Sequence, residues 1–262
     1  MVIRTGTGGW SYPPWRGVFY PKGLRQADEL AYASRAHGAI EINSTYQSFQ
    51  TPETFARWAS QTPDGFIFAV KASRVCTNRR VLAEAGESVS RFLGQGLVRL
   101  GDRLGPILWQ FMPTKAFDPD DFGAFLGLLP PAWDGARLRH AVEVRHASFA
   151  DPRFVAMCRA RGVAIVLIDS PSHPMIDEAT ADFAYVRLMR GVDDIATGYA
   201  PEALDAWAER LGVLTGSGAP TTRDVFAFFI RAGKLRAPAA AMALAARVAG
   251  GHPGAAVQSL GD

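Results

Sequence analysis

The residues best suited to chemistry stand at the ends of segments that otherwise read as buried strands. In HAVEVRHASF, residues 140–149, Val142 and Val144 alternate with Glu143 and Arg145. Because successive side chains of a strand point to opposite faces, Glu143 and Arg145 share one face. Strands buried between two layers of helices are apolar on both faces, so this charged face predicts a polar site.

The same test on five other apolar segments finds further polar side chains in phase near their carboxyl ends. These are Glu41 and Asn43 in AIEIN, Lys71 in FIFAVKA, Gln110 in PILWQ, Asp169 in VAIVLID and Arg187 in FAYVRL. In folds built from parallel strands, catalytic groups gather at the carboxyl ends of the strands. We therefore expect these residues to line one rim.

Three carboxylates on such a rim suit general acid–base catalysis. Burial raises the pKa of a carboxyl group and a nearby cation lowers it, so one rim can hold carboxyl groups of different proton affinity. The candidate catalytic residues are Glu41, Lys71, Glu143 and Asp169. Glu143 or Glu41 would be the base, and Lys71 would be an electrostatic stabiliser or a Schiff-base nucleophile.

The cations of the rim predict a small polar or anionic substrate. Arg145 and Arg187 would bind a carboxylate or phosphate group in bidentate fashion, and Arg231 would add charge. The candidate substrate-binding residues are Trp10, Tyr12, Asn43, Gln110, Arg145, His146 and Arg187. The alternative is that the charges pair with one another in a structural ion network without catalysis.

A metal site is a weaker interpretation of the same residues. Glu41, Glu143, His146 and Asp169 have oxygen and imidazole ligands that Mg²⁺, Mn²⁺ or Zn²⁺ accept. Lys71 and Arg145 would repel a metal ion, so the sequence favours a site without one. No Rossmann, Walker A or Gly-x-Ser-x-Gly sequence occurs, and the cofactor stays unspecified.

An aromatic loop, GTGGWSYPPWRGVFYP, follows the first strand at residues 6–21. Its glycines allow close approach of the backbone, and Trp10, Tyr12 and Trp15 supply flat apolar surface. The loop would form either a wall on which a sugar ring or a base stacks, or a plug of aromatic side chains over the end of the fold.

Eight strands alternating with helices must position these residues. The predicted strands are Ile3–Thr7, Ala39–Asn43, Phe66–Lys71, Ile107–Gln110, Ala141–Arg145, Val163–Asp169, Phe183–Leu188 and Val225–Ile230. Helices are predicted to start at Thr51-Pro52-Glu53, Asp118-Pro119, Asp151-Pro152 and Pro201-Glu202, and to cover 87–100, 239–248 and a short turn at Glu178–Ala181.

This alternation predicts an α/β fold, a single-domain (β/α)8 TIM barrel. An open doubly wound sheet is the runner-up, but its strands should be apolar on both faces. The barrel domain would cover residues 1–249, and 250–262 would form a flexible tail.

Composition limits the classes of function. No apolar run approaches the roughly 18 residues of a membrane span, and the amino terminus lacks the apolar region of a signal peptide, which predicts a cytoplasmic protein. Cys76 and Cys158 match no metal-ligand spacing and fit free thiols. A net charge of +3 is weak support for a nucleic-acid partner.

Several stretches resemble the YecE-like family, also called domain of unknown function 72. They are GTGGWSYPPWRGVFYP, EINSTYQSF, TPETFARW, DGFIFAVKAS, LGPILWQF, EVRHASF, IDSP and ADFAYVRL, and they occur in family order. The resemblance implies a TIM barrel and a site at the matching positions. It implies no reaction, because the biochemical function of the family is not established.

Three positions depart from the family pattern near the expected pocket. The family's Thr-His pair is Thr77-Asn78 here, its His after YVRL is Met189, and its Phe-Asn-Asn run is Phe229-Ile230-Arg231. The departures leave the scaffold intact but imply a different substrate or a lost activity.

Two functions remain open. The first is a small-molecule hydrolase, lyase or isomerase that uses the rim carboxylates. The second is a nucleic-acid or nucleotide binding protein that would use Trp10 and Trp15 as stacking platforms. Its basic residues would be Arg74, Arg79, Arg80, Arg231, Lys234 and Arg236. The sequence predicts no oligomeric state.

Overall fold

A computed structural model describes residues 1–216, 222–230 and 234–251 of the chain. The chain divides into two compact units. The first unit comprises Met1–Glu41, Gln61–Phe66 and Asp182–Asp262, and the second comprises Ile42–Ser60 and Ile67–Ala181. The predicted residue Arg231 and all but the first two residues of the predicted tail 250–262 lie outside the described part.

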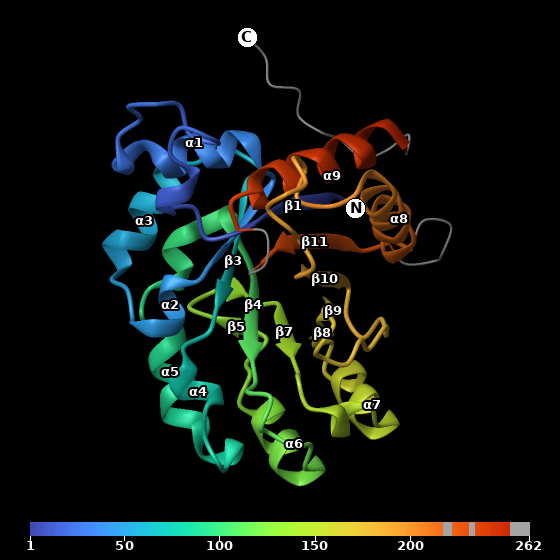
Figure 1. The fold of residues 1–262 in the computed structure, drawn as a ribbon. Coiled ribbons are helices and arrows are strands. Elements are labelled where there is room, and N and C mark those ends of the chain that lie inside the picture. The colour runs from blue at the N-terminus through green and yellow to red at the C-terminus, as the bar shows by residue number, and fades with distance from the viewer. Residues whose placement is uncertain (217–221, 231–233, 252–262) are drawn as a thin grey trace. The chain divides into compact units, whose positions relative to one another are not determined.

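The first unit is built on four parallel strands in the order β2-β1-β11-β10 (Figure 1). The strands are β1 (Ile3–Gly8), β2 (Ala39–Ile42, whose last residue falls in the second unit), β10 (Phe183–Leu188) and β11 (Asp224–Phe229). The helices are α1 (Glu29–Ala36), α8 (Pro201–Leu214) and α9 (Ala237–Gly251), with short 3-10 turns η1 (Pro13–Trp15) and η2 (Gln26–Asp28).

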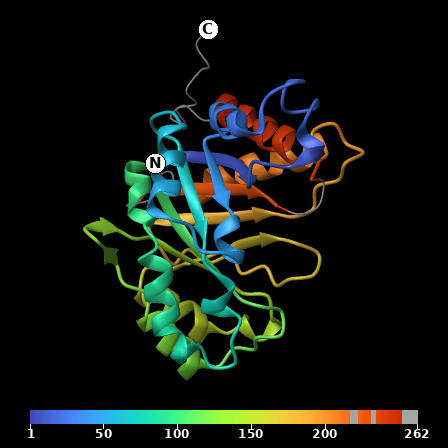
Figure 2. The same cartoon turned by 90° about the vertical axis from the view of Figure 1, so that its left-hand side faces the viewer.

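Two close contacts hold β1 in place, one with strand β2 and one with helix α9. A Cβ atom on Gly6 would lie 1.7 Å from the carbonyl oxygen of Ala39, so only glycine lets β1 approach β2 this closely. On α9, the Ala241 carbonyl accepts a 3.0 Å hydrogen bond from the Thr5 hydroxyl. Figure 2 shows α1 and α9 next to each other in this unit.

The second unit has four parallel strands in the order β8-β7-β4-β3. Its strands are β3 (Ile67–Lys71), β4 (Leu104–Gln110), β7 (His140–Glu143), β8 (Ala164–Ile165), β9 (Leu167–Asp169) and the hairpin β5 (Ala132–Trp133) with β6 (Ala136–Arg137). Its helices are α2 (Ser44–Gln47), α3 (Pro52–Ser60), α4 (Arg74–Thr77), α5 (Gly86–Leu93), α6 (Pro119–Gly127) and α7 (Pro152–Ala160). The 3-10 turns are η3 (Leu82–Ala85), η4 (Leu97–Arg103) and η5 (Ala147–Phe149).

The four predicted helix starts are confirmed, three of them with a side-chain cap and the fourth, at Pro201, without one. The Asp118 carboxylate accepts hydrogen bonds from the backbone of Asp120 and Asp121 at 3.0 and 3.1 Å. Asp151 accepts one from Arg153 at 2.8 Å, and the Thr51 hydroxyl accepts one at 3.3 Å from the first turn of α3. Each cap satisfies an amide that the helix cannot pair internally.

Two helix predictions were wrong in part or entirely. The helix expected over 87–100 ends at Leu93, and Gly96 then adopts a φ of 107°, after which a 3-10 turn continues the chain. The turn of helix expected at Glu178–Ala181 does not form. There the Thr180 hydroxyl donates to the Val163 carbonyl at 2.7 Å and accepts from the Ile165 amide at 3.1 Å, which ties the segment to β8.

Aromatic side chains form much of the core of the second unit. Phe122 on α6 contacts Phe149 and Phe154, with ring centroids 5.6 and 5.2 Å apart. Cys76 and Cys158 are free, as predicted; the structure buries both, and burial raises the pKa of each thiol to about 12. No helix of the described residues combines the length and the apolar character needed to cross a membrane.

Candidate functional site

The last residues of four strands of the second unit are polar and buried. Lys71 ends β3, Gln110 ends β4, Glu143 ends β7 and Asp169 ends β9, and none is more than 9% exposed. Because β3, β4 and β7 are parallel neighbours, their carboxyl ends lie at one edge. We call these four residues the polar row, and the sequence predicted all of them.

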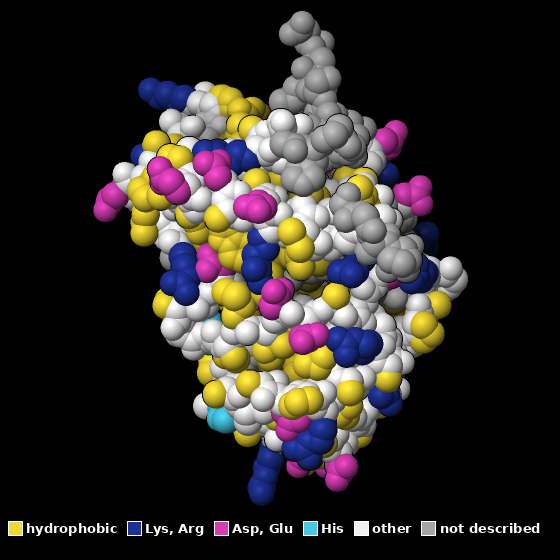
Figure 3. All heavy atoms as spheres, turned by 90° about the vertical axis from the view of Figure 1, so that its right-hand side faces the viewer, with side chains coloured by type: hydrophobic (Ala, Val, Ile, Leu, Met, Phe, Trp, Pro, Cys, Tyr) yellow, Lys and Arg dark blue, Asp and Glu magenta, His cyan; other side chains and the backbone are white. Residues whose placement is uncertain are grey.

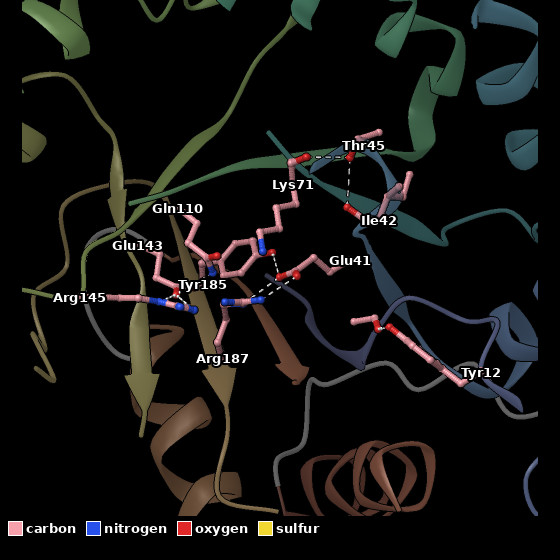
Figure 4. Close-up of polar contacts among 11 residues, drawn as sticks. Tyr12, Glu41, Ile42, Thr45, Lys71, Gln110, Glu143, Arg145, Tyr185 and Arg187 are labelled. Carbon is pink, nitrogen blue, oxygen red and sulfur yellow. Dashed lines mark hydrogen bonds and ion pairs between the residues drawn. The ribbon is translucent and has the colours of Figure 1, made fainter. Parts of the chain in front are cut away.

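Glu143 in the polar row accepts hydrogen bonds from two neighbouring side chains (Figure 4). Its Oε1 atom accepts a 2.9 Å hydrogen bond from Gln110 Nε2, because the register of β4 and β7 places the two residues side by side. The same oxygen accepts a 2.6 Å bond from Arg145 Nε. A guanidinium and an amide therefore hold one oxygen of a fully buried carboxylate. Because β7 ends at Glu143, Arg145 lies just beyond the strand rather than on its face as predicted, and the ion pair joins the two residues at that end.

Lys71 lies against an aromatic ring. Its Nζ atom is 4.1 Å from the centre of the Tyr46 ring, and its backbone carbonyl accepts a 2.7 Å hydrogen bond from the Thr45 hydroxyl. The Tyr46 hydroxyl in turn accepts from Asn78 Nδ2 at 3.2 Å. Asn78 stands at a position where the sequence departs from the family pattern. Here its side chain binds Tyr46, which in turn contacts Lys71.

The other predicted residues of the second unit are more peripheral. Asn43 is half-buried and directly precedes α2. His146 is half-buried, and its Nδ1 atom contacts the Ser148 hydroxyl at 2.8 Å and accepts from the Ser148 amide at 3.2 Å. This nitrogen caps η5, so only Nε2 is left for a ligand.

In the first unit, Glu41 and Arg187 form a buried ion pair (Figure 4). Arg187 donates from Nε to Glu41 Oε2 at 3.1 Å and from Nη2 to Oε1 at 3.0 Å, a bidentate fork. The Tyr185 hydroxyl donates to Oε2 at 2.7 Å. All three residues are at most 1% exposed. This arrangement matches the structural network that the sequence left as an alternative.

In the aromatic loop of the first unit, the Trp15 side chain is packed into the core, as the plug interpretation expects. The Trp15 indole is 1% exposed and donates to the Lys234 carbonyl at 2.7 Å, so the prediction that Trp15 offers a stacking platform was wrong. Trp10 and Tyr12 remain half-buried, and the Trp10 carbonyl accepts from the Tyr20 hydroxyl. Tyr12 donates to the Gly8 carbonyl at 2.5 Å, and burial followed by the charge of Glu41 raises the pKa of its hydroxyl.

Tyr185 contacts Glu41 and Tyr46 contacts Lys71, but neither tyrosine was among the predicted site residues. Tyr185 is in phase with Arg187 on β10, so strand alternation carried a signal for it. Tyr46 lies on the short helix α2, where no strand pattern exists to reveal it.

Met189 and Ile230, at the other two departures from the family pattern, are buried apolar residues. In the described part of the chain, no three His, Cys, Asp or Glu residues group as metal ligands would.

The comparisons with known proteins identify the family. The sequence matches the family described as "Protein of unknown function DUF72" over residues 4–259. The chain belongs to the DUF72 family. It is 29% identical over 181 residues to the UPF0759 protein YecE of Escherichia coli, both in strain K12 and in O157:H7. The match covers 66% of this chain and 61% of each relative, so it spans about three fifths of their length. The resemblance to the YecE-like family is confirmed.

Solved structures of DUF72 proteins have the same fold. A crystal structure from Thermotoga maritima MSB8 has a TM-score of 0.72 and 24% identity, and the match covers 93% of this chain and 97% of that one. One from Enterococcus faecalis V583 has a TM-score of 0.72 and 17% identity over 95% and 96%. At this level of identity the likeness concerns the fold alone. The predicted α/β fold of the TIM-barrel class is confirmed.

The first testable consequence of the site geometry concerns Tyr185. We expect Tyr185→Phe to lower the free energy of unfolding by about 2 kcal/mol, because it removes a hydrogen bond to a buried charged oxygen. Urea unfolding followed by circular dichroism measures the change. Tyr32→Phe is the matched control, because the Tyr32 side chain is exposed. Equal stability of Tyr185→Phe and wild type would contradict the buried hydrogen bond.

Proposed function

We propose that this DUF72 protein is an enzyme that acts on a small polar or anionic molecule at the polar row of the second unit. The observation that carries the proposal is the placement of Lys71, Gln110, Glu143 and Asp169 as the last residues of their strands, each nearly buried. Burying four polar groups is costly for stability unless they are paired, and strand ends are where barrel enzymes place reactive groups.

The residues of the polar row would divide the chemistry. Glu143 would exchange a proton with the substrate, and Arg145, whose side chain retains 11% exposure, would bind an anionic group of the substrate. Lys71 would stabilise negative charge that develops during the reaction. Proton transfer without a redox step corresponds to a hydrolase, a lyase or an isomerase.

The contacts of Glu41 argue for a supporting role. Both of its oxygens accept hydrogen bonds from Arg187, and one also accepts from Tyr185, inside the first unit. The guanidinium that holds Glu41 is itself only 2% exposed, which suits a structural ion pair, whereas Arg145 beside Glu143 keeps 11% exposure. We therefore assign the proton transfer to Glu143 rather than Glu41.

Nucleic-acid binding has less support. The Arg79 guanidinium is engaged locally, with hydrogen bonds to the Val75 and Glu84 carbonyls, and Trp15 is buried. Arg74 and Arg80 are exposed. On the face drawn in Figure 3, acidic and basic side chains are interspersed rather than gathered in a basic patch. Binding of this kind would be recognised by a steep loss of affinity with salt.

A thermal-shift screen of the full chain tests the proposal. The panel contains sugars, sugar phosphates, carboxylic acids, nucleotides and short oligonucleotides, each with Mn²⁺ or with EDTA. A small anion at about 100 times its Kd should raise the Tm by about 5 °C. We expect this shift to disappear in Glu143→Gln and in Arg145→Ala, which remove the proton-transfer group and the anion-binding group.

Two controls match these variants. Glu178→Gln and Arg153→Ala change the same residue types at exposed ion pairs of the same unit and should retain the shift. A shift that survives in Glu143→Gln and Arg145→Ala would place the ligand elsewhere. A shift given only by oligonucleotides and abolished by salt would replace the proposal with nucleic-acid binding.

A further inference from the structure

A cavity lies in the first unit, and no residue of the polar row lines it. It has a volume of about 580 Å³ and lies among the loop at Val18 and Phe19, helix α1 and the first turns of α9. In Figures 1 and 2, α1 and α9 are neighbours. None of the candidate catalytic or substrate-binding residues lines this cavity, although Arg236, one of the basic residues predicted for nucleic-acid binding, does. Its size is within the range of cavities that bind small molecules, which is about 300–1,000 Å³.

The cavity has mainly apolar walls. Phe19, Tyr32, Pro238, Ala239 and Met242 contribute to them. Tyr32 and Met242 keep 38% and 46% of their surface exposed, although both are large apolar side chains. Neighbouring exposed apolar groups around a hollow are typical of a surface that binds an apolar group.

The charges of the cavity all have one sign. Arg35 on α1 and Arg236 before α9 are its charged lining residues, and no acidic residue lines it. Arg35 donates to the Ala31 carbonyl at 2.5 Å, and Arg236 Nε donates to the Asp193 carbonyl at 3.2 Å. The Asp193 carboxylate accepts from backbone amides instead.

Neither arginine has a carboxylate partner among the described residues. Other exposed arginines of the chain do: Arg25 pairs with Asp28, Arg153 with Asp151 and Arg159 with Glu178. Two guanidiniums beside an apolar hollow, both bound only to neutral carbonyls, are complementary to a molecule that joins an apolar body to an anionic head.

We propose that this cavity binds an amphipathic carboxylic acid. Its alkyl chain or aromatic ring would lie between Phe19, Ala239 and Met242, and its carboxylate would accept hydrogen bonds from Arg35 and Arg236. The proposal does not depend on the function proposed for the polar row, because the two sites lie in different units and share no residue.

Isothermal titration of the full chain with octanoate tests the proposal, with octanamide as the neutral analogue. We expect saturable binding of octanoate and an affinity for octanamide that is about 10-fold lower, since the amide carries no charge for the guanidiniums. Arg35→Gln and Arg236→Gln should each weaken octanoate binding about 5-fold, because each removes one charged donor. Ala239→Trp should abolish binding because its side chain fills the hollow.

The controls separate this site from non-specific adsorption. Arg25→Gln removes an exposed arginine of the same unit that does not line the cavity, and it should bind octanoate as wild type does. Glu143→Gln should also bind octanoate normally, which distinguishes this cavity from the polar row. Absence of saturable octanoate binding would overturn the proposal, as would binding that is unchanged in the Arg35→Gln/Arg236→Gln double variant and in Ala239→Trp.

Discussion

Replacing Arg187 with Met is expected to lower the free energy of unfolding by about 3–5 kcal/mol. The substitution removes the guanidinium that holds both oxygens of the buried Glu41 carboxylate, and removing one partner of a buried ion pair is among the costliest changes in a folded protein. Methionine preserves much of the volume of the arginine side chain, so the loss reports charge rather than a cavity. Urea unfolding at neutral pH measures the effect.

A double variant distinguishes lost charge pairing from lost packing. In Glu41→Gln/Arg187→Met no uncompensated charge remains, so part of the lost stability should return. The matched control is Arg159→Met, which removes an arginine from an exposed pair with Glu178 and should change stability by less than about 0.5 kcal/mol. A loss below about 1 kcal/mol in Arg187→Met would show that the pair is hydrated and not buried as described.

Acidification from pH 7 to pH 4.5 should destabilise the wild-type protein by about 2–3 kcal/mol through His37 alone. This histidine follows α1, is 5% exposed and stacks on Phe19 with the ring centroids 5.3 Å apart. Neither of its ring nitrogens has a hydrogen-bond partner among the described residues. Burial lowers its pKa from 6.5 to about 4, because the charged form is poorly solvated inside the unit.

The direction of the effect follows from proton binding. Between pH 6.5 and about pH 4 the unfolded chain carries a proton on His37 and the folded chain does not. The free energy of unfolding therefore falls as the pH falls through this window and is fully recovered above pH 6.5. Burial also lowers the pKa of His140, whose Nδ1 accepts from Trp109 at 3.1 Å, so the second unit loses stability in the same direction.

His37→Phe isolates this contribution. Phenylalanine keeps the stacking on Phe19 but cannot bind a proton, so the stability of the variant relative to wild type should rise by about 2–3 kcal/mol between pH 7 and pH 4.5. Urea titrations at the two pH values measure it. His146→Gln serves as the control, because His146 is half-buried and hydrogen-bonded to Ser148. Parallel pH dependence of His37→Phe and wild type would contradict a neutral buried His37.

The predictions for Arg187 and His37 depend on two different ways in which a buried ionisable side chain is tolerated. Arg187 and Glu41 are both charged and cancel each other's cost of desolvation through a bidentate contact. The ring nitrogens of His37 have no hydrogen-bond partner in the described part of the chain, and the side chain avoids that cost by staying neutral. The polar row differs from both, since Glu143 contacts Arg145, whose side chain keeps 11% exposure.

The sequence predicted one strand over Val163–Asp169 where the structure has β8 and β9, and it missed the hairpin of β5 and β6. It determined by itself the α/β class, most strand segments and the polar residues near their ends. It could do so because strand alternation and helix caps are local: Pro119 and Pro152 follow capping aspartates, and Glu143 and Arg145 stand two residues apart. The same locality misled the prediction at Glu178–Ala181, where Thr180 bonds to a strand distant in sequence instead of forming a helix.

Only the tertiary structure decided which charged residues are partners. Glu41 and Arg187 are 146 residues apart, and their pairing depends on the order of parallel strands, which no local pattern encodes. The burial of Trp15, the contact of Tyr46 with Lys71 and the cavity between α1 and α9 have the same origin. A sequence shows which side chains share a strand face, whereas packing decides which of those faces meet and which stay open to a ligand.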